Sequence, residues 1–541
     1  MLSNSIPLEN TTPSGIAAPS KHSSHYGQDD EDNLTETTSH QSAATTHSVH
    51  QTTSKYDTEE GDEEREKEGG GEEQALPYSH FSSKKRTMIV TITALTGLVS
   101  PLASNMYYPS IQHIRDDLHT TQSGITWTVT SFIIAMAVFP LVWSNLADQI
   151  GRKPVYVMSM LTFVCGSIGC ALSNNLAALI ASRVIQSAGS SAVQGAGAGT
   201  ISDIYPREKR GTALGIYYLG PLLGPCLGPL IGGYVGEGVG WRWVFWILAI
   251  WGGIMMLLAL LVLPETHRRI VVDRGHRIAL VNIPRPLGIR ENNPLLDIAT
   301  VRYPVVALAM LHFAMIFGAY FTNATGQPLA YENVYGLSQG MAGICFLSSG
   351  VGCITGSISG GRVTDMLLAR AKRQALLARE AEQPQTGADA EAKAESEAKA
   401  AAEIKVPAET RLGAMWIGSV LFLAALLISG WLIDRELSLA GVLVMQFFVG
   451  AGMAFTFQGL GGYVIDVFPT MSARITGVQN FWRSVWAAVI VQLFPTMLRN
   501  IGWGWSYTIM FFLTLMSLTL IQLLVVFRGE RLRARFGPKS A

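Results

Sequence analysis

The sequence predicts an all-α polytopic membrane protein, with twelve transmembrane helices arranged as two six-helix halves. Of its 541 residues, 48% are hydrophobic and 15% are charged, whereas roughly a quarter of the residues in a typical soluble domain are charged. The charged residues gather in a few blocks. The apolar segments between them are about twenty residues long, which is the length that crosses a bilayer. The net charge of zero gives no indication of a nucleic-acid partner.

Composition divides the chain into tails, halves and insertions. Residues 1–83 are polar and predict a disordered cytosolic tail. The N-terminal half, 84–265, holds spans at 87–107, 125–146, 155–172, 177–202, 211–235 and 243–263. A cytosolic connector, 266–302, precedes the C-terminal half, 303–527, whose spans are expected at 303–325, 340–361, 412–433, 438–461, 477–498 and 503–527. A cytosolic insertion, 366–411, and a basic tail, 528–541, complete the chain.

Basic residues follow alternate loops and set the predicted topology. Arg152 and Lys153 lie in one such loop, and Arg268 and Arg269 in another. Because short cytosolic loops are enriched in Lys and Arg, both termini are expected in the cytosol. The two halves also repeat one another: Asp203 in Asp-Ile-Tyr-Pro matches Asp466 in Asp-Val-Phe-Pro. Such repeats are typical of transporters that bind substrate between their halves, near the middle of the membrane.

The fifth predicted span, 211–235, carries glycines at four-residue spacing and three internal prolines. A row of glycines lets a second helix approach closely, and membrane helices tolerate proline because neighbours satisfy the freed carbonyls. A purely structural packing face is the alternative interpretation. The pattern resembles the antiporter motif of major facilitator superfamily exporters, and its matching positions are Gly224, Gly228, Pro229, Gly232 and Gly233.

A second motif lies between spans two and three, in Ser144 to Lys153. It is similar to the superfamily's cytoplasmic loop motif, with Asp148, Gly151, Arg152 and Lys153 at the matching positions, although Ser144 and Gln149 depart from it. The resemblance implies that Asp148 helps to latch a cytoplasmic gate. A generic hairpin turn between two spans is the alternative. The segment from Ser100 to Pro109 further resembles the first-helix signature of fungal-type twelve-span drug:proton antiporters, a family that includes exporters of organic acids.

Two arginines lie within predicted spans, where charge is costly and usually functional. Arg183 and Gln186 in span four resemble the family's fourth-helix motif, and the resemblance implies proton coupling or substrate contact. Arg483 in span eleven is the second candidate. Either arginine could instead lie at an interface. Because no Asp or Glu lies well inside a predicted span, a buried arginine favours an anionic or neutral polar substrate.

Five further polar or aromatic residues are candidates for lining the substrate or proton pathway, and they include Tyr108 in span one and Asn323 in span seven. Asn105 lies in span one and Gln458 in span ten. His312 in span seven could carry a proton because its reference pKa lies near neutrality. The alternative for His312 is a structural hydrogen bond between helices.

These features predict a secondary exporter rather than an enzyme. The sequence has no G-x-x-x-x-G-K-[ST] loop and no nucleophile constellation, so neither a cofactor nor a metal is expected. We expect proton-coupled efflux of a small organic metabolite, with an organic acid such as itaconate or citrate favoured. A broad multidrug:proton antiporter and a transporter-like nutrient sensor are the alternatives. The expected partners are the substrate, protons and the lipid bilayer, with the chain a monomer in the plasma membrane.

Overall fold

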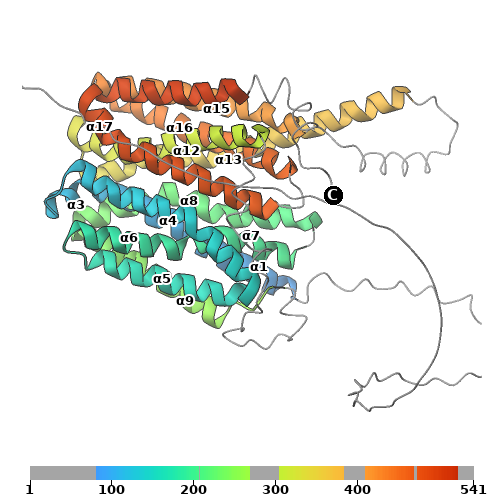
Figure 1. Ribbon diagram of the computed structural model, residues 1–541, viewed down its shortest axis with the longest axis horizontal. Helices are drawn as coiled ribbons and strands as arrows, with labels where there is room; N and C mark the ends of the chain where they lie inside the picture. Colours follow the sequence, from blue (N-terminus) through green and yellow to red (C-terminus); the bar gives the residue numbers. More distant parts are fainter. Residues whose placement is uncertain (1–80, 206, 268–303, 383–407, 468–471, 522–541) are drawn as a thin grey trace, which may run out of the picture. The chain divides into compact units, whose positions relative to one another are not determined.

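The computed structural model describes residues 81–205, 207–267, 304–382, 408–467 and 472–521. These residues all belong to one structural unit, Ala75–Ala541. The predicted N-terminal tail, most of the connector, the larger part of the 366–411 insertion and the C-terminal tail lie outside the described residues. Within the described part, regular structure is helical throughout (Figure 1).

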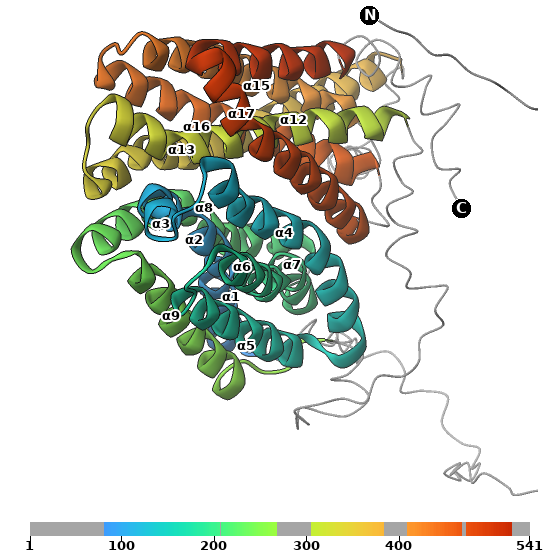
Figure 2. The same cartoon turned by 60° about the vertical axis from the view of Figure 1, so that its left-hand side comes forward.

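The first half begins with a helix broken into short pieces and continues with five more membrane-spanning segments. Its helices pack together as one group, coloured blue to green in Figure 2. The elements are α1 (Ser83–Gly97), α2 (Val99–Asn105), η1 (Tyr108–Ser110), α3 (Ile111–Asp117), α4 (Gln122–Ile150), α5 (Arg152–Ala171), α6 (Leu176–Ser190), α7 (Ala192–Ile204), α8 (Arg207–Val239) and α9 (Trp241–Leu261).

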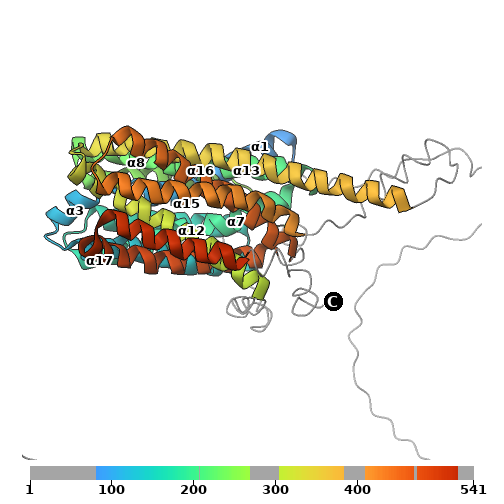
Figure 3. The ribbon, with the colours of Figure 1, turned by 90° about the horizontal axis from the view of Figure 1, so that it is seen from above.

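The second half forms the other group, coloured yellow to red in Figure 2. One of its helices, α13, continues beyond its membrane span, and Figure 3 shows this end projecting past the other helices. The elements are α12 (Pro304–Leu329), η3 (Ala330–Val334), α13 (Gln339–Glu382), η4 (Ala408–Arg411), α15 (Leu412–Asp434), α16 (Leu439–Val467) and α17 (Ser472–Ile521).

Eleven of the described helical segments are long and apolar enough to cross a membrane. The last, Thr476–Ile521, has 46 residues, more than twice the roughly 20 that one crossing needs. It is interrupted at Gly502, whose φ of 76° lies in the left-handed region that glycine adopts without strain. Asp434 Oδ1 accepts a hydrogen bond from the Gly504 backbone N–H at 3.0 Å, at the start of the second segment. The described residues therefore contain the twelve predicted crossings, because the last segment is divided in two at Gly502.

Large apolar side chains cover the outer surface of the bundle, as expected of helices that face lipid. Leu261, Phe512 and Ile250 are 76%, 60% and 58% exposed. Buried polar residues are also numerous, and side-chain or backbone partners on neighbouring helices satisfy many of them. The fold is thus apolar outside and selectively polar inside.

The seventh crossing is longer than predicted. The sequence suggested 303–325, but α12 continues through Pro328 to Leu329, and η3 extends it to Val334. Proline is tolerated here because neighbouring helices and local adjustments of the backbone satisfy the freed groups. The extension places Gln327, Tyr331 and Glu332 on this crossing.

Helix α8, the predicted fifth span, is one continuous helix despite its three prolines. Its glycine row packs against the first crossing: a Cβ at Gly224 would overlap Pro101, and one at Gly228 would come within 2.7 Å of the Asn105 Cβ. Another face packs against α13 of the second half, where a Cβ at Gly233 would lie 2.7 Å from the Gln339 carbonyl oxygen. Small residues therefore let α8 fit tightly between its own half and the other.

The most extensive contacts between the halves are those of α8 with α13 and of α4 with α17. In the first pair, Glu237 Oε2 accepts hydrogen bonds from the Gly340 backbone N–H at 2.6 Å and from Ser338 Oγ at 3.0 Å. In the second, Thr130 donates to Gln492 at 3.0 Å. We name the two ends of the bundle after Glu237 and Asp148. Each lies near the C-terminal end of its helix, and α8 and α4 cross the membrane in opposite directions because they are the fifth and second crossings.

Candidate functional site

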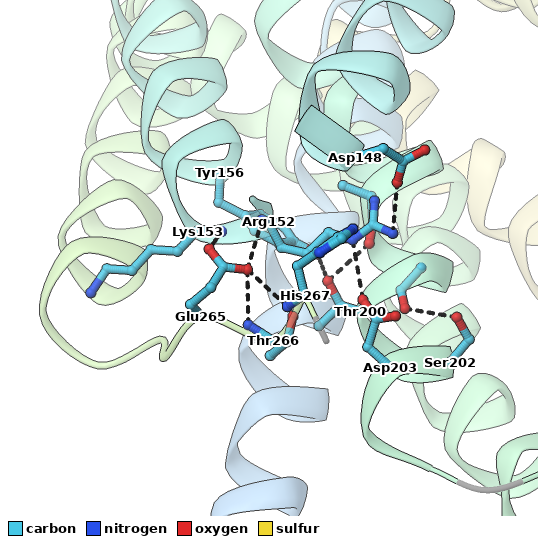
Figure 4. Close-up of polar contacts among 12 residues, drawn as sticks. Asp148, Arg152, Lys153, Tyr156, Thr200, Ser202, Asp203, Glu265, Thr266 and His267 are labelled. Carbon is cyan, nitrogen blue, oxygen red and sulfur yellow. Dashed lines mark hydrogen bonds and ion pairs between the residues drawn. The ribbon is translucent and has the colours of Figure 1, made fainter. Parts of the chain in front are cut away.

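The loop motif forms a charged cluster at the Asp148 end (Figure 4). Gly151 ends α4 with a φ of 106°, a backbone conformation that favours glycine. The turn lets Arg152 form ion pairs with Asp148 at 3.0 Å and with Asp203 at 3.2 Å. Arg152 and Lys153 are 8% and 9% exposed. The four predicted motif residues are thus brought together, with Arg152 at the centre.

Glu265 completes this cluster and was missed by the sequence analysis. Its two carboxylate oxygens accept hydrogen bonds from the backbone N–H groups of Arg152 at 2.9 Å and Lys153 at 3.1 Å (Figure 4). Residues 152 and 153 open α5, so the carboxylate caps a helix N-terminus, where negative charge is stabilising. Glu265 follows α9, and it therefore ties the sixth crossing to the loop motif. No local sequence pattern indicated this long-range cap.

Arg183 is buried inside the first half, at 1% exposure. One terminal guanidinium nitrogen, Nη1, donates to the Ala103 carbonyl at 3.2 Å and to Gln186 Oε1 at 2.8 Å. The guanidinium carbon lies 4.5 Å from the centre of the Tyr107 ring and 4.2 Å from that of Phe132. These contacts come from the first, second and fourth crossings, so Arg183 is enclosed by neutral groups.

Gln186 has the orienting role in this pair. Its Oε1 accepts from Arg183, and its Nε2 donates to Ser167 Oγ at 2.9 Å. The amide thus fixes one guanidinium nitrogen while the Nε of Arg183 has no hydrogen-bond partner among the described residues. A guanidinium has five N–H donors, so this arrangement leaves donor capacity for an anion.

Arg483 is the corresponding cation in the second half, on the eleventh crossing. Its Nε and Nη2 both donate to Asn480 Oδ1, at 2.9 and 2.6 Å. The guanidinium carbon lies 4.4 Å from the centre of the Phe317 ring. Phe313 and Phe457, which stack at 4.0 Å, complete an aromatic surround. The Arg483 guanidinium, like that of Arg183, thus contacts aromatic rings and a side-chain amide.

Three of the other predicted pathway residues form hydrogen bonds with groups other than the two arginines. The two ring nitrogens of His312 lie 2.8 Å from Ser517 Oγ and 3.0 Å from Ser419 Oγ. Asn105 donates to the Pro101 carbonyl at 2.7 Å. Gln458 is exposed and donates to Ser357 at 2.7 Å. His312 therefore bridges three crossings of the second half.

Gln446 is a further buried polar residue that the sequence analysis missed. Its amide is reciprocally bonded to that of Asn323: Asn323 Nδ2 donates to Gln446 Oε1 at 2.8 Å, and Gln446 Nε2 donates to Asn323 Oδ1 at 3.1 Å. Gln446 is the eighth residue of α16, as Arg183 is of α6. Each also lies twenty residues before the repeated aspartate (203 − 183 and 466 − 446). This shared spacing could have identified Gln446 from the sequence.

Comparison with known proteins shows the family. The model of the Major Facilitator Superfamily matches residues 93–378, just over half of the chain, and the chain belongs to this superfamily. Its helices also superpose on those of the E. coli xylose transporter XylE, in a partially occluded inward-open conformation, with a TM-score of 0.59 and 15% identity over 82% of this chain and 98% of that one.

Curated relatives define the class more narrowly. The MFS-type transporter phiD of a fungal species is 27% identical over 80% of this chain and 67% of its own length. The efflux pump radE of Floropilus chiversii is 26% identical, over 88% and 86%. Quinidine resistance protein 1 of Saccharomyces cerevisiae is 27% identical, over 86% and 88%. The chain is therefore a superfamily transporter whose relatives include efflux-type and drug-resistance proteins, as the predicted fungal antiporter family implied.

Proposed function

We propose that this protein is a secondary exporter of a small anionic metabolite, which it moves by alternating access in exchange for protons. The observation that carries the proposal is Arg183, a fully buried cation surrounded by neutral groups in a superfamily transporter. Protons, a small-molecule substrate and the lipid bilayer are its proposed partners. The proposed working form is a monomer in the plasma membrane.

The charge of Arg183 supports an anionic substrate. Its hydrogen bonds go to a carbonyl and an amide, and its guanidinium lies near two aromatic rings. Burying a cation without a counter-charge is costly, and aromatic rings offset only part of the cost. A carboxylate on the substrate would supply the missing charge through a bidentate pair. Arg483, held by Asn480 and three phenylalanines, offers a second such position.

The contacts between the halves support alternating access. At the Glu237 end, the two halves are joined by charge-assisted hydrogen bonds. At the opposite end, the ion pairs and hydrogen bonds of Asp148 and Arg152 go to residues of their own half. We infer that the Asp148 end is cytosolic, as the basic loops predict, and that the described state faces the cytosol. Both termini would then be cytosolic.

Multidrug export is the second candidate function. The aromatic surround of Arg483 is large and apolar, which suits a flat organic ligand. A relative named for quinidine resistance points in the same direction. Under this alternative Arg483 would contact drugs, and Arg183 would act as a structural cation.

Export from cells with and without the protein tests these functions. Released carboxylic acids and retained quinidine are measured at external pH 5 and 7. We expect selective release of one or a few acids, faster at the lower pH because protons then enter down a steeper gradient. Altered quinidine retention with unchanged acids would favour multidrug export. Deleting residues 1–80 separates a sensor from a transporter, because a sensor would lose its signalling output while a transporter would keep its flux.

A further inference from the structure

Three polar side chains form a row along the seventh crossing. Asn323, Gln327 and Tyr331 are spaced by four residues, which places them on one face of α12 and η3. They are 0%, 2% and 0% exposed. We call these three residues the polar row. Polar groups inside a membrane protein are expensive and mark functional sites by default.

The first part of the row is fully bonded. Asn323 and Gln446 exchange two amide hydrogen bonds, and Tyr507 Oη donates to Asn323 Oδ1 at 3.0 Å. Gln327 Nε2 also donates to Gln446 Oε1, at 2.7 Å. Gln446 therefore anchors the row to the tenth crossing and fixes the direction of the Gln327 amide.

The second part of the row has two polar atoms without hydrogen-bond partners. Gln327 Oε1 and Tyr331 Oη are both buried and have no hydrogen-bond partner among the described residues. Each such buried group destabilises the folded protein, and native structures keep few of them. A leucine and a phenylalanine at these positions would avoid the cost, so the polar atoms need a reason beyond folding.

A neighbouring element of the first half also carries buried polar atoms without hydrogen-bond partners. Helix α3, which contacts α12, carries Gln112, and both polar side-chain atoms of Gln112 are buried without a partner in the described structure. Tyr108, one turn before Gln112, stacks on Phe346 with ring centres 6.3 Å apart, and Tyr331 meets the same ring edge-on at 6.1 Å. Unsatisfied polar atoms of both halves thus gather where the first and seventh crossings meet.

We propose that the polar row is a second substrate subsite, which hydrogen-bonds an uncharged hydroxyl or amide group of the transported molecule. It rests on the proposed export function. The row lies where the first and seventh crossings, one from each half, meet around Phe346, so movement of the halves relative to one another changes its exposure. Gln446, which anchors the row, stands at the repeat position of Arg183, so the two subsites are related by the symmetry of the halves.

The chemistry of the row selects a neutral group. Gln327 Oε1 can accept a hydrogen bond from a hydroxyl or amide, whereas an ionised carboxylate has no proton to donate. The hydroxyl of Tyr331 can donate a hydrogen bond to the bound group. The nearby Arg115 is already paired with Asp116 at 2.6 Å. Arg183 and the row together therefore favour a hydroxylated acid over an acid that has carboxylates alone.

Matched probes test this subsite in proteoliposomes that contain the full-length protein. Malate and succinate differ by one hydroxyl, as do quinidine and its deoxy analogue. We expect wild-type protein to transport malate about 10-fold faster than succinate at low concentration. A site that hydrogen-bonds a substrate hydroxyl rejects the analogue that lacks it. Gln327→Leu should remove this preference by slowing malate, without lowering the melting temperature.

Two further variants make the test specific. Tyr331→Phe removes only the unpartnered hydroxyl and should raise the KM for malate more than it lowers kcat. Gln122→Leu makes the same chemical change as Gln327→Leu at the Glu237 end but outside the row, and it should keep the malate preference.

Each outcome separates the subsite from the export function. Equal wild-type transport of malate and succinate would overturn the subsite and leave acid export standing. Transport of quinidine but of neither acid would overturn acid export, and the quinidine pair would then decide the subsite by the same criterion. An unchanged malate preference in both Gln327→Leu and Tyr331→Phe would also overturn it. Transport of none of the four probes would overturn both proposals.

Discussion

Glu237 of the first half caps the first turn of α13 in the second half. Its Oε2 accepts a hydrogen bond from the Gly340 backbone N–H at 2.6 Å and another from Ser338 Oγ. A carboxylate at a helix N-terminus is favoured by the exposed N–H groups and by the helix dipole. This contact must break before the halves can part at the Glu237 end, so it stabilises the described state.

Neutralising Glu237 should shift the balance between states. Glu237→Gln keeps the size of the side chain but removes its charge, which weakens the cap by about 1–2 kcal/mol. The population open at the Glu237 end should rise about 10-fold. Spin labels at the exposed positions His113 and Ala440, one in each half, report the separation. An unchanged distance distribution in Glu237→Gln would show that the cap does not hold the halves together.

The glycine row of α8 offers a matched pair of variants. A Cβ at Gly224 would overlap Pro101, whereas a Cβ at Gly215 meets nothing within 4 Å. Gly224→Ala should therefore push α8 away from the first crossing. This change should lower the melting temperature and reduce the flux several-fold. Gly215→Ala should be neutral or stabilise the helix by up to about 1 kcal/mol. Equal effects of the two variants would contradict the packing role of the row.

Removing the Glu265 cap should destabilise the first half. Glu265→Ala leaves the first N–H groups of α5 without their carboxylate, a loss of about 1–2 kcal/mol. Thermal unfolding in detergent measures it. Asp148→Asn is the comparison, because Asp148 has a side chain that is 59% exposed in its ion pair with Arg152, and such pairs contribute little to stability. A larger loss of stability in Asp148→Asn than in Glu265→Ala would refute this assignment.

His312 should act as a structural bridge. Both ring nitrogens lie within hydrogen-bond distance of serine hydroxyls, and the side chain is fully buried, so protonation would place a charge in a site that has only neutral partners. His312→Ala should lower stability by about 1–3 kcal/mol while the dependence of the remaining flux on external pH stays the same. Flux against pH in proteoliposomes checks this, and a flattened pH profile would instead identify His312 as a proton carrier.

The sequence predicted the twelve crossings because each apolar segment is long enough to span a bilayer and is bounded by charge. It also predicted that Asp148, Gly151 and Arg152 act together, because a turn between two spans is a local feature. Glu265 escaped prediction because its cap joins residues 113 positions apart. Such a contact depends on how the crossings pack.

The interior of the second half was predicted less well. The seventh span was expected to end at residue 325, whereas α12 continues through Pro328, a proline that a membrane helix tolerates. Gln327 and Tyr331 were therefore not considered. Gln446 was not among the predicted residues, even though its distance from Asp466 repeats that of Arg183 from Asp203. The direction that Arg183 faces could not be read from its span, because most neighbouring residues there are small or apolar.

The central claim is that Arg183 binds the anionic part of an exported metabolite. Its most direct test is malate and itaconate transport in proteoliposomes under an imposed proton gradient, for wild-type protein, Arg183→Ala and Arg183→Lys. We expect gradient-driven transport of at least one acid by the wild type, loss of at least 100-fold in Arg183→Ala with the melting temperature retained, and partial activity in Arg183→Lys, which keeps the charge without the planar fork. Wild-type flux in Arg183→Ala would contradict the account.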